Sequence, residues 1–444
     1  MSELDFLRGS ALSRRALLRG TGLAFVGLSA AALVGCGDDD DEAPAQLGTA
    51  SVLGVWGSGD ELDRFEAMVA PWQSATGGRM GFTGTRDLTA LLTTRVEGND
   101  PPDIAIPPEV GLFRQFAREG RLVPLADCGL DEFVKENYPQ AFIDLGTVDG
   151  TLYGFFMKAD NKGTIWYNPK VFAENGWEPL TADSTFDDLL ELTQTIAGSG
   201  LAPWSIGVES GGASGWPGTD WLQQILLGEP DGPEVNDGLV DGSIPWTDPR
   251  VQAVWEQFGQ IALNPDYTVQ GGPTGINATA FVPSSYPPYE DPPTAAMVYL
   301  GGFAAGFIAE QFPSLVAGED YDFMPFPGGG IAGGANVVFA FNDEATTCSL
   351  MQHLASAEAQ QIWVDQGGFT SVNNQVNLDG YPDIVSRKLA EGLLSAKAFR
   401  FDLDDAIGGA TQQAIFAGVT EYLANPGSLG TILQNIEGAR QAEG

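Results

Sequence analysis

Short apolar runs alternate with amphipathic segments from residue 51 onward, and this alternation limits the fold more than any other feature. Ser51 to Trp56 is typical of a buried strand, and apolar residues between Leu62 and Trp72 then recur at helical spacing. Met80 to Thr83 is expected to form the next strand, Asp87 to cap a helix through Val96, and Asp103 to Ile106 to form a third strand. Three successive strand–helix units predict a parallel sheet and therefore an α/β fold.

The later part of the chain continues this pattern. Helices are expected after Thr185 and from Asp248 onward, because each start places a capping residue before an apolar helical stripe. Asn336 to Phe341 is expected to form a strand. Glu229 to Ser243 is rich in Gly, Pro and Asp, and Gly271 to Pro293 also has few periodic apolar residues, so both are expected to be long surface loops.

The N-terminal segment has the pattern of an export signal. Ser13 to Arg19 contains a twin-arginine pair, and the apolar run from Leu23 to Val34 is too short to span a bilayer. The run ends at Cys36 in a sequence that resembles the lipobox of bacterial lipoproteins. We expect residues 1–35 to be a signal peptide, Cys36 to carry lipid, and residues 36–49 to form an acidic tether. The alternative interpretation is a buried helix with an incidental cysteine.

Composition excludes several classes of function. Lys and Arg number 21 against 59 Asp and Glu, a formal net charge of -38, so the phosphate backbone of nucleic acids would be repelled. His353 is the only histidine, which leaves no material for a multi-histidine metal site. It lies on an expected amphipathic helix, where a structural role is predicted. The three cysteines form no CxxC pair, and whether Cys128 and Cys348 form a disulfide stays open.

Two other patterns are uninformative about function. Gly328, Gly330 and Gly333 match GxGxxG, but the strand expected to follow them stands where a dinucleotide site needs a helix. Carboxylate pairs suited to glycoside hydrolysis can be found among 59 acidic residues in many places, so no pair is marked out. We predict neither a cofactor nor a metal, and no catalytic residue.

Aromatic residues next to Gly and Pro are more informative. Trp56 ends a strand, Trp216 lies between Gly215 and Pro217, and Tyr299 and Phe303 flank a Gly-Gly pair. Sugar rings pack their C–H faces on aromatic rings, while their hydroxyls need planar polar partners. Core packing is the alternative for each ring. Core packing is the weaker alternative for Trp216 and Trp221, which flank Asp220. Asp220 itself is expected either to cap a helix over 221–227 or to bind the sugar.

Several segments resemble the extracellular solute-binding proteins of sugar ABC importers, in particular the alpha-glucoside-binding branch. The resemblance spans about residues 50–440 and is carried by five segments: TGTRDLTALLTTR (83–95), PPDIA (101–105), GTIWYNPKVFAENGW (163–177), ESGGASGWPGTDW (209–221) and EDYDFMPFP (319–327).

The resemblance implies a periplasmic-binding-protein fold of the maltodextrin-binding type, with two α/β lobes joined by a hinge. Lobe one would comprise 50–160 and 327–378, and lobe two 161–326 and 379–444. The cleft between the lobes would hold the ligand, because open α/β sheets bind ligands at the carboxyl ends of their strands.

Cleft residues carry over where the motifs match. The expected ligand-binding residues are Trp56, Ser58, Thr85, Arg86, Asp87, Glu109, Lys158, Asp160, Trp216, Asp220, Trp221, Tyr299, Phe303 and Asn336.

The chain is therefore predicted to be an exported, lipid-anchored binding protein and not an enzyme. It would act as a monomer that captures an oligosaccharide or alpha-glucoside and presents it to ABC permease subunits, with the membrane contacted through the lipid on Cys36. A binding protein for a polyamine or another small solute is one alternative, and a secreted glycoside hydrolase is a remote one.

Overall fold

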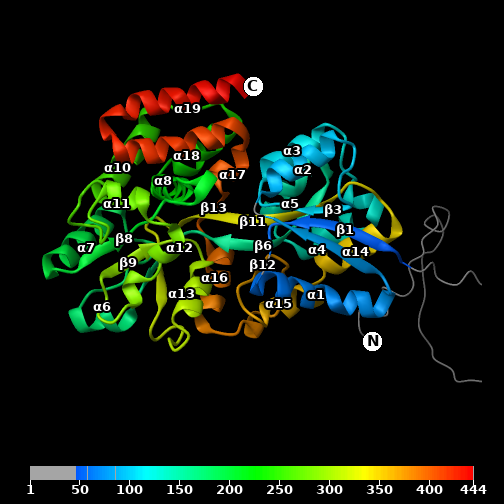
Figure 1. Ribbon diagram of the computed structural model, residues 1–444, viewed down its shortest axis with the longest axis horizontal. Coiled ribbons are helices and arrows are strands. Elements are labelled where there is room, and N and C mark those ends of the chain that lie inside the picture. The colour runs from blue at the N-terminus through cyan, green and yellow to red at the C-terminus, as the bar shows by residue number, and fades with distance from the viewer. Residues whose placement is uncertain (1–46, 58, 86, 444) are drawn as a thin grey trace, which may run out of the picture.

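The computed structural model describes residues 47–443 except 58 and 86 (Figure 1). The expected signal peptide, Cys36 and all but the end of the acidic tether lie outside the described residues, as do Ser58 and Arg86. Among the described residues, no helix is both long and apolar enough to cross a membrane.

One sheet of seven strands forms the first unit of the molecule. Its order is β12-β6-β11-β3-β1-β2, and β13 also pairs with β11. β1 is parallel to β2 and to β3, which confirms the parallel arrangement predicted for the first three strands. β11 runs antiparallel to β3 and β6. The strands are β1 (Thr49–Gly54), β2 (Arg79–Gly84), β3 (Ile104–Ile106), β6 (Gly154–Asn161), β11 (Gly330–Ala340), β12 (Thr370–Ser371) and β13 (Ala398–Phe401).

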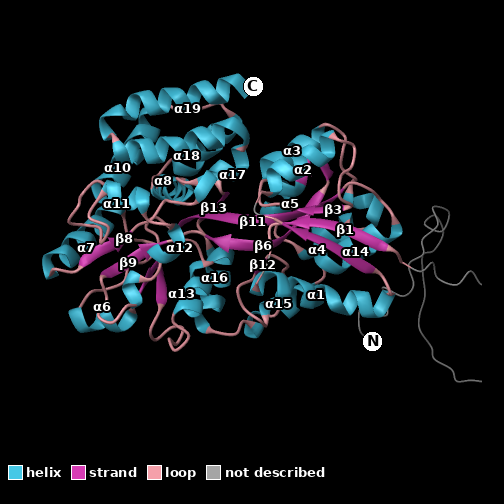
Figure 2. Cartoon of the chain, viewed as in Figure 1, coloured by secondary structure: helices cyan, strands magenta, loops and turns pink. Residues whose placement is uncertain are grey.

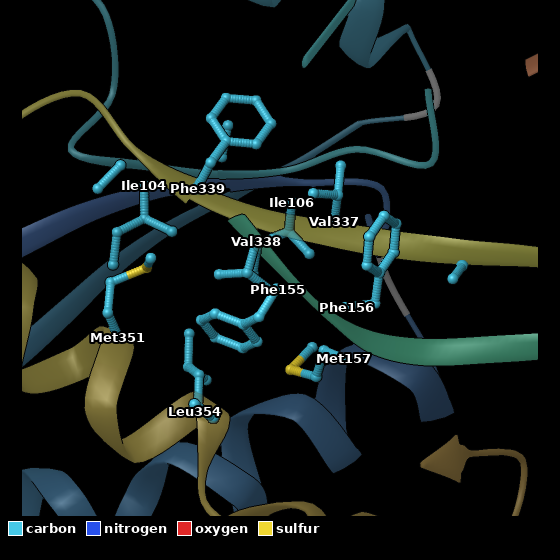
Figure 3. Close-up of a cluster of buried hydrophobic side chains, with 14 of the residues drawn as sticks. Ile104, Ile106, Phe155, Phe156, Met157, Val337, Val338, Phe339, Met351 and Leu354 are labelled. Carbon is cyan, nitrogen blue, oxygen red and sulfur yellow. The ribbon is translucent and has the colours of Figure 1, made fainter. Parts of the chain in front are cut away.

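Helices cover this sheet and close a hydrophobic core. Figure 3 shows Met351 and Leu354 of α14 below Phe155 and Val338 of the neighbouring strands β6 and β11. Each of these four side chains is at most 1% exposed, because the apolar face of α14 packs against apolar residues of the two strands. The helices of this unit are α1 (Asp60–Thr76), α2 (Leu88–Glu97), α3 (Val110–Arg118), α4 (Asp131–Asn137), α5 (Gln140–Gly146), α14 (Ala345–Ala355) and α15 (Ala357–Val364).

A four-stranded sheet of order β10-β7-β9-β8 forms the second unit, which has its own hydrophobic core. Figure 2 shows β8 and β9 of this sheet among the helices of the unit. Its strands are β7 (Thr164–Tyr167), β8 (Ala202–Ser205), β9 (Ala295–Tyr299) and β10 (Asp322–Pro325). Its helices are α6 (Pro169–Asn175), α7 (Phe186–Ser199), α8 (Trp216–Gly228), α9 (Gly232–Asp241), α10 (Pro249–Ala262), α11 (Pro273–Ala278), α12 (Phe281–Ser284), α13 (Ala304–Gln311), α18 (Gly409–Ala424) and α19 (Leu429–Glu443).

The chain passes between the two sheets at three places. β6 leads directly into β7, β10 leads into β11, and β13 is followed by the short helix α17 (Leu403–Ile407), which packs on the second unit. α16 (Ile384–Ser395) contributes to the first core and to a separate apolar cluster that includes Trp166 and Phe323 of the second sheet. Because β13 pairs with β11, part of 379–444 lies in the first sheet. The lobe limits given above stay a prediction.

Two expected loops contain helices instead. Glu229 to Ser243 contains α9, in which Val235 and Leu239 are buried on one face. Gly271 to Pro293 contains α11 and α12. The expectation of loops was wrong because packing against the second core stabilises helices whose sequences, rich in Gly and Pro, have little helical tendency of their own.

Several local predictions are confirmed. Thr185 caps α7 in a reciprocal capping box with Asp188. Asp248 caps α10 through the backbone N–H of Arg250. His353 is buried in α14, and its Nε2 lies 2.8 Å from the carbonyl oxygen of Met68, so its role in this structure is packing.

A disulfide joins Cys128 and Cys348, which are 220 residues apart in the sequence. It ties α14 to the short 3-10 helix Leu125–Cys128. Disulfides persist in oxidising compartments, which agrees with export of the protein.

Candidate ligand-binding site

Three aromatic residues of the expected site belong to the core. Trp56 is 1% exposed and packs on Phe65 and Trp363. Trp221 is also 1% exposed, and Tyr299, 3% exposed, packs on it and donates its hydroxyl hydrogen to the carbonyl oxygen of Asp220. Their sequence neighbours suggested exposure, but each of these large rings is buried in one of the two cores and stabilises it. In this structure their faces are closed to a ligand.

Asp220 does not cap a helix, which corrects one of the two roles expected for it. α8 begins at Trp216, so four helical residues precede Asp220, and the Asp220 side chain is fully buried. Its Oδ1 accepts a hydrogen bond of 2.9 Å from Nζ of Lys162. Its Oδ2 is buried and has no hydrogen-bond partner among the described residues.

Lys162 lies where β6 passes into β7 and contacts every segment that crosses between the sheets. Its backbone N–H donates to Ala332 of β11 over 2.9 Å, and its ammonium group bonds both Asp220 and Asp402. Nζ also lies 5.3 Å from the centre of the Trp216 ring. The cation therefore fixes the position of Trp216 by electrostatic attraction to the ring face.

Trp216 is part of a group of four aromatic rings that are all partly exposed. The ring centres of Trp216 and Phe281 are 5.0 Å apart, and those of Trp216 and Phe303 are 5.9 Å apart. Phe307 contacts Phe281 and Phe303. The four come from α8, α12, the loop after β9 and α13. Partly exposed rings held by one another form a rigid apolar surface, which is what a sugar ring packs on.

Buried carboxylates surround Lys162 on its other side. Thr219 donates its hydroxyl hydrogen to Asp404, and Gln412 donates to Asp404 and Asp405. Burial raises the pKa of Asp220, Asp404 and Asp405 well above the usual range, and neighbouring carboxylates raise it further against the opposing effect of Lys162. These carboxyl groups therefore hold their protons to a higher pH than exposed carboxyl groups do.

The first unit contributes charged groups from β6 and α1. Nζ of Lys158 lies 2.8 Å from Glu61 Oε1 and 5.5 Å from the ring centre of Trp363. Two residues along the strand, Asp160 is partly exposed, and burial raises its pKa while Lys158 and Lys162 lower it. Asp160 and Lys162 thus lie at the end of β6 that leads to the second unit.

The remaining expected residues lie in the loops after β1, β2 and β3 and in β11. A Cβ atom on Gly84 would lie 2.1 Å from the carbonyl oxygen of Trp56, so glycine is required there for the first two loops to meet. Thr85 is partly exposed. Asp87 is exposed at the start of α2 and makes no side-chain hydrogen bond to the helix, so the prediction that it caps this helix was wrong. Glu109 accepts a hydrogen bond from Thr89, and burial raises its pKa. Asn336 is buried at an irregularity in the pairing of β11 with β6.

A shallow groove at the outer edge of the first sheet lies next to the first two of these loops, because Gly57 and Gly84 line it. It is lined by Asp63 and Glu66 of α1 and by Met80 and Phe82 of β2, among others. None of the expected site residues lines it, and it brings no pair of aromatic faces together.

Sequence comparison identifies the family of this α/β chain. Residues 67–388 match the bacterial extracellular solute-binding protein family, a stretch that covers well over half of the 444 residues. The chain belongs to this family. Solute-binding proteins of this family are extracellular, so the protein is exported from the cytoplasm.

Two curated relatives align with almost the whole solute-binding protein. The osmoprotective compounds-binding protein GgtB of Synechocystis is 35% identical over 91% of this chain and 94% of its own. The alpha-glucosides-binding periplasmic protein AglE of Rhizobium meliloti is 31% identical over 86% of this chain and 84% of its own.

Solved structures support the fold of this solute-binding protein. The bacterial solute receptor AcbH, described as having an exclusive preference for β-D-galactopyranose, matches with a TM-score of 0.75 at 18% identity, over 89% of this chain and 98% of its own. At that identity the match shows the fold alone. It confirms the predicted class, a mixed α/β fold of the solute-receptor type.

Several residues near the candidate site of this solute-binding protein were missed in the sequence. Lys162 could have been noticed, because it is a charged residue directly after a long apolar strand. The acidic run at Asp402 to Asp405 was another visible signal. Phe281 and Phe307 gave none, because their meeting with Trp216 depends on how distant helices pack.

Proposed function

We propose that this protein is the sugar-binding component of an ABC importer and that its ligand is an alpha-glucoside or oligosaccharide. One observation carries the proposal: four partly exposed aromatic rings lie beside a charged group. Trp216 and Phe303 offer ring faces, and Lys162 holds Trp216 in place. Apolar ring faces next to charged hydrogen-bonding groups match the two kinds of surface that a sugar presents.

The names of the relatives narrow the proposed ligand. AglE is named for alpha-glucosides and GgtB for osmoprotective compounds. Sucrose and trehalose are alpha-glucosides that also act as osmolytes, so they fit both names and are the first compounds to test. Longer oligosaccharides are the next compounds to test, because the group of four aromatic rings offers more surface than a single sugar ring covers.

The proposed mechanism is closure of two lobes around the sugar. The polar groups of the first unit, Lys158, Asp160, Glu109, Thr85 and Asp87, would meet the ring face of the aromatic group on the second unit. Closure would remove water from the sugar and present both lobes, as a monomer, to the permease subunits. Scattering at small angles should show a more compact particle when the sugar is bound.

A thermal-shift screen followed by calorimetry tests the proposal. A ligand at 100 times its Kd adds about 2.7 kcal/mol to the free energy of unfolding, which is easily detected. We expect stabilisation by at least one of sucrose, trehalose or maltose. Stabilisation by spermidine and by no saccharide would establish the polyamine alternative instead.

The family consists of binding proteins, and a hydrolytic activity remains the remote alternative. Buried carboxyl groups with raised pKa values occur around Lys162, but hydrolysis needs two such groups astride the scissile bond. Incubation of purified protein with alpha-glucosides should leave them intact. Release of glucose that is lost in a carboxylate variant would overturn the assignment as a binding protein.

The membrane anchor belongs to the same proposal. Processing before Cys36 would leave a lipidated cysteine as the new N-terminus, followed by the acidic tether, on the outer face of the cell membrane. Metabolic labelling with a fatty acid should tag the wild-type protein and not Cys36→Ser. Equal release of both proteins into the medium would argue against the anchor.

A further inference from the structure

Three buried carboxylates near Lys162 lie close enough to share one ion. Asp220, Asp402 and Asp404 each offer an oxygen, and these oxygens lie within 4.8 Å of one another. Oxygen ligands of Ca²⁺ lie about 2.3–2.6 Å from the ion, so two ligands of one ion are at most roughly 5 Å apart. The separation therefore fits ligands that surround a single cation.

The charge of this cluster is not balanced by its visible partners. Lys162 is the ammonium group that pairs with Asp220 and Asp402. Asp404 and Asp405 accept hydrogen bonds only from neutral groups, Thr219 and Gln412. Four carboxylates against one ammonium leave three negative charges in a buried place, which costs free energy unless a cation or protons neutralise them.

An unsatisfied atom points to a ligand independently of the charge. The Asp220 side chain is 2% exposed, and its Oδ1 bonds Lys162, whereas its Oδ2 is buried without a hydrogen-bond partner among the described residues. Buried carboxylate oxygens are almost always satisfied in proteins. The lone oxygen belongs to the same carboxylate that lies against Asp402 and Asp404.

We propose that Asp220, Asp402 and Asp404 bind a hard divalent cation, with Ca²⁺ as the best fit. All donors are carboxylate oxygens, which hard cations prefer, and Ca²⁺ tolerates the irregular geometry that side chains from different elements produce. Lys162 bonds one oxygen of Asp220 and one of Asp402, and Asp404 accepts hydrogen bonds from Thr219 and Gln412, so the ion would share these carboxylates with the donors already present. This site goes beyond the expectation from the sequence, in which no metal was predicted.

The position of the site gives it a structural consequence. Asp220 belongs to α8 of the second unit, while Asp402 directly follows β13 of the first sheet and leads into α17. A bound ion would join these segments. α17 in turn lies against α3 of the first unit, where a Cβ atom on Gly111 would lie 3.0 Å from the carbonyl oxygen of Ile407. Cation binding would therefore stiffen a connection between the two units.

Titration calorimetry with CaCl₂ on the chelator-treated mature protein tests the site. We expect one Ca²⁺ site per chain. It should saturate at a much lower Ca²⁺ concentration than the weak, general binding expected of an acidic surface. The melting temperature should rise with Ca²⁺.

Two variants make the test specific. Asp404→Asn should weaken the stoichiometric site at least tenfold, whereas Asp183→Asn, which alters an exposed carboxylate paired with Lys397, should leave it unchanged. Circular dichroism reports whether Asp404→Asn is folded, and if it is not, Asp402→Asn replaces it. Wild-type protein that shows only the weak general binding, or a stoichiometric site that survives these substitutions in folded protein, would overturn the proposal. Protonation alone would then neutralise the cluster.

Discussion

Nζ of Lys162 lies 2.9 Å from Oδ1 of Asp220, and the two side chains are only 11% and 2% exposed. Lys162 comes from the end of the strand that leaves the first sheet, and Asp220 from a helix of the second unit. A buried ion pair at this position is costly to break, because removal of one charge leaves the other without its partner in a medium of low polarity.

Lys162→Met should therefore destabilise the protein strongly. Asp220 and Asp402 would lose their common cation, and loss of one partner of a buried pair typically lowers the free energy of unfolding by about 3–5 kcal/mol. Urea unfolding at pH 7.5 measures the loss. Lys170→Met is the matched control: Lys170 pairs with Asp320 at the surface, so its replacement should leave unfolding nearly unchanged. Similar behaviour of both variants would mean that Lys162 is not a structural cation.

Substitution in the aromatic group should lower the affinity for the sugar more than it lowers the stability of the fold. Trp216→Ala is expected to weaken sugar binding by roughly tenfold to thirtyfold, about 1.4–2 kcal/mol, because a ring face that packs on the sugar is lost. Calorimetry with the sugar found in the thermal-shift screen measures this. Phe186→Ala provides the control, since Phe186 is a partly buried ring of α7 that packs on the second core and is absent from the candidate site. It should lower the melting temperature and leave affinity unchanged.

The disulfide should contribute substantially to stability. Cys128 and Cys348 enclose a long segment of chain, and a cross-link restricts the unfolded state more as the enclosed segment lengthens. Replacement of both cysteines by serine is expected to lower the free energy of unfolding by about 2–5 kcal/mol. Wild-type protein in the presence of a reductant should unfold at the same urea concentration as the double variant. A reductant that leaves the wild-type transition unmoved would contradict the prediction.

His353 should make the protein less stable in mild acid. Burial lowers the pKa of His353 below its ordinary value of 6.5, against the opposing effects of Met68 and Glu358. The unfolded chain then takes up a proton more readily than the folded one, so the contribution of neutral His353 is present above pH 6.5 and is lost as the pH falls toward the folded pKa. The loss is at most about 1.4 kcal/mol per pH unit.

Comparison with His353→Gln isolates this effect from the many carboxylates. Between pH 7.5 and pH 5.5, the wild type should lose more free energy of unfolding than the variant does, because glutamine does not titrate. Equal losses in the two proteins would show that His353 does not contribute to the acid sensitivity.

Local sequence patterns predicted those elements whose signals lie within a few residues. Thr185 and Asp188 are three residues apart, so their capping box is visible in the sequence and is present in the structure. The parallel pairing of the first strands also followed from the strand–helix alternation. α9 was missed because Val235 and Leu239 form too short an apolar pattern to indicate a helix without the core on which they pack.

The sequence by itself determined that this chain has an α/β fold of the solute-receptor class and that its acidity excludes nucleic acid, because periodicity, charge and motifs are properties of neighbouring residues. Only the tertiary structure decided which polar and aromatic residues are buried and which meet. Trp56 and Trp221 are in the cores, whereas Trp216 joins Phe281, Phe303 and Lys162, from segments up to about 140 residues apart in the chain. Burial depends on what the rest of the fold places against a side chain, and no local pattern contains that information.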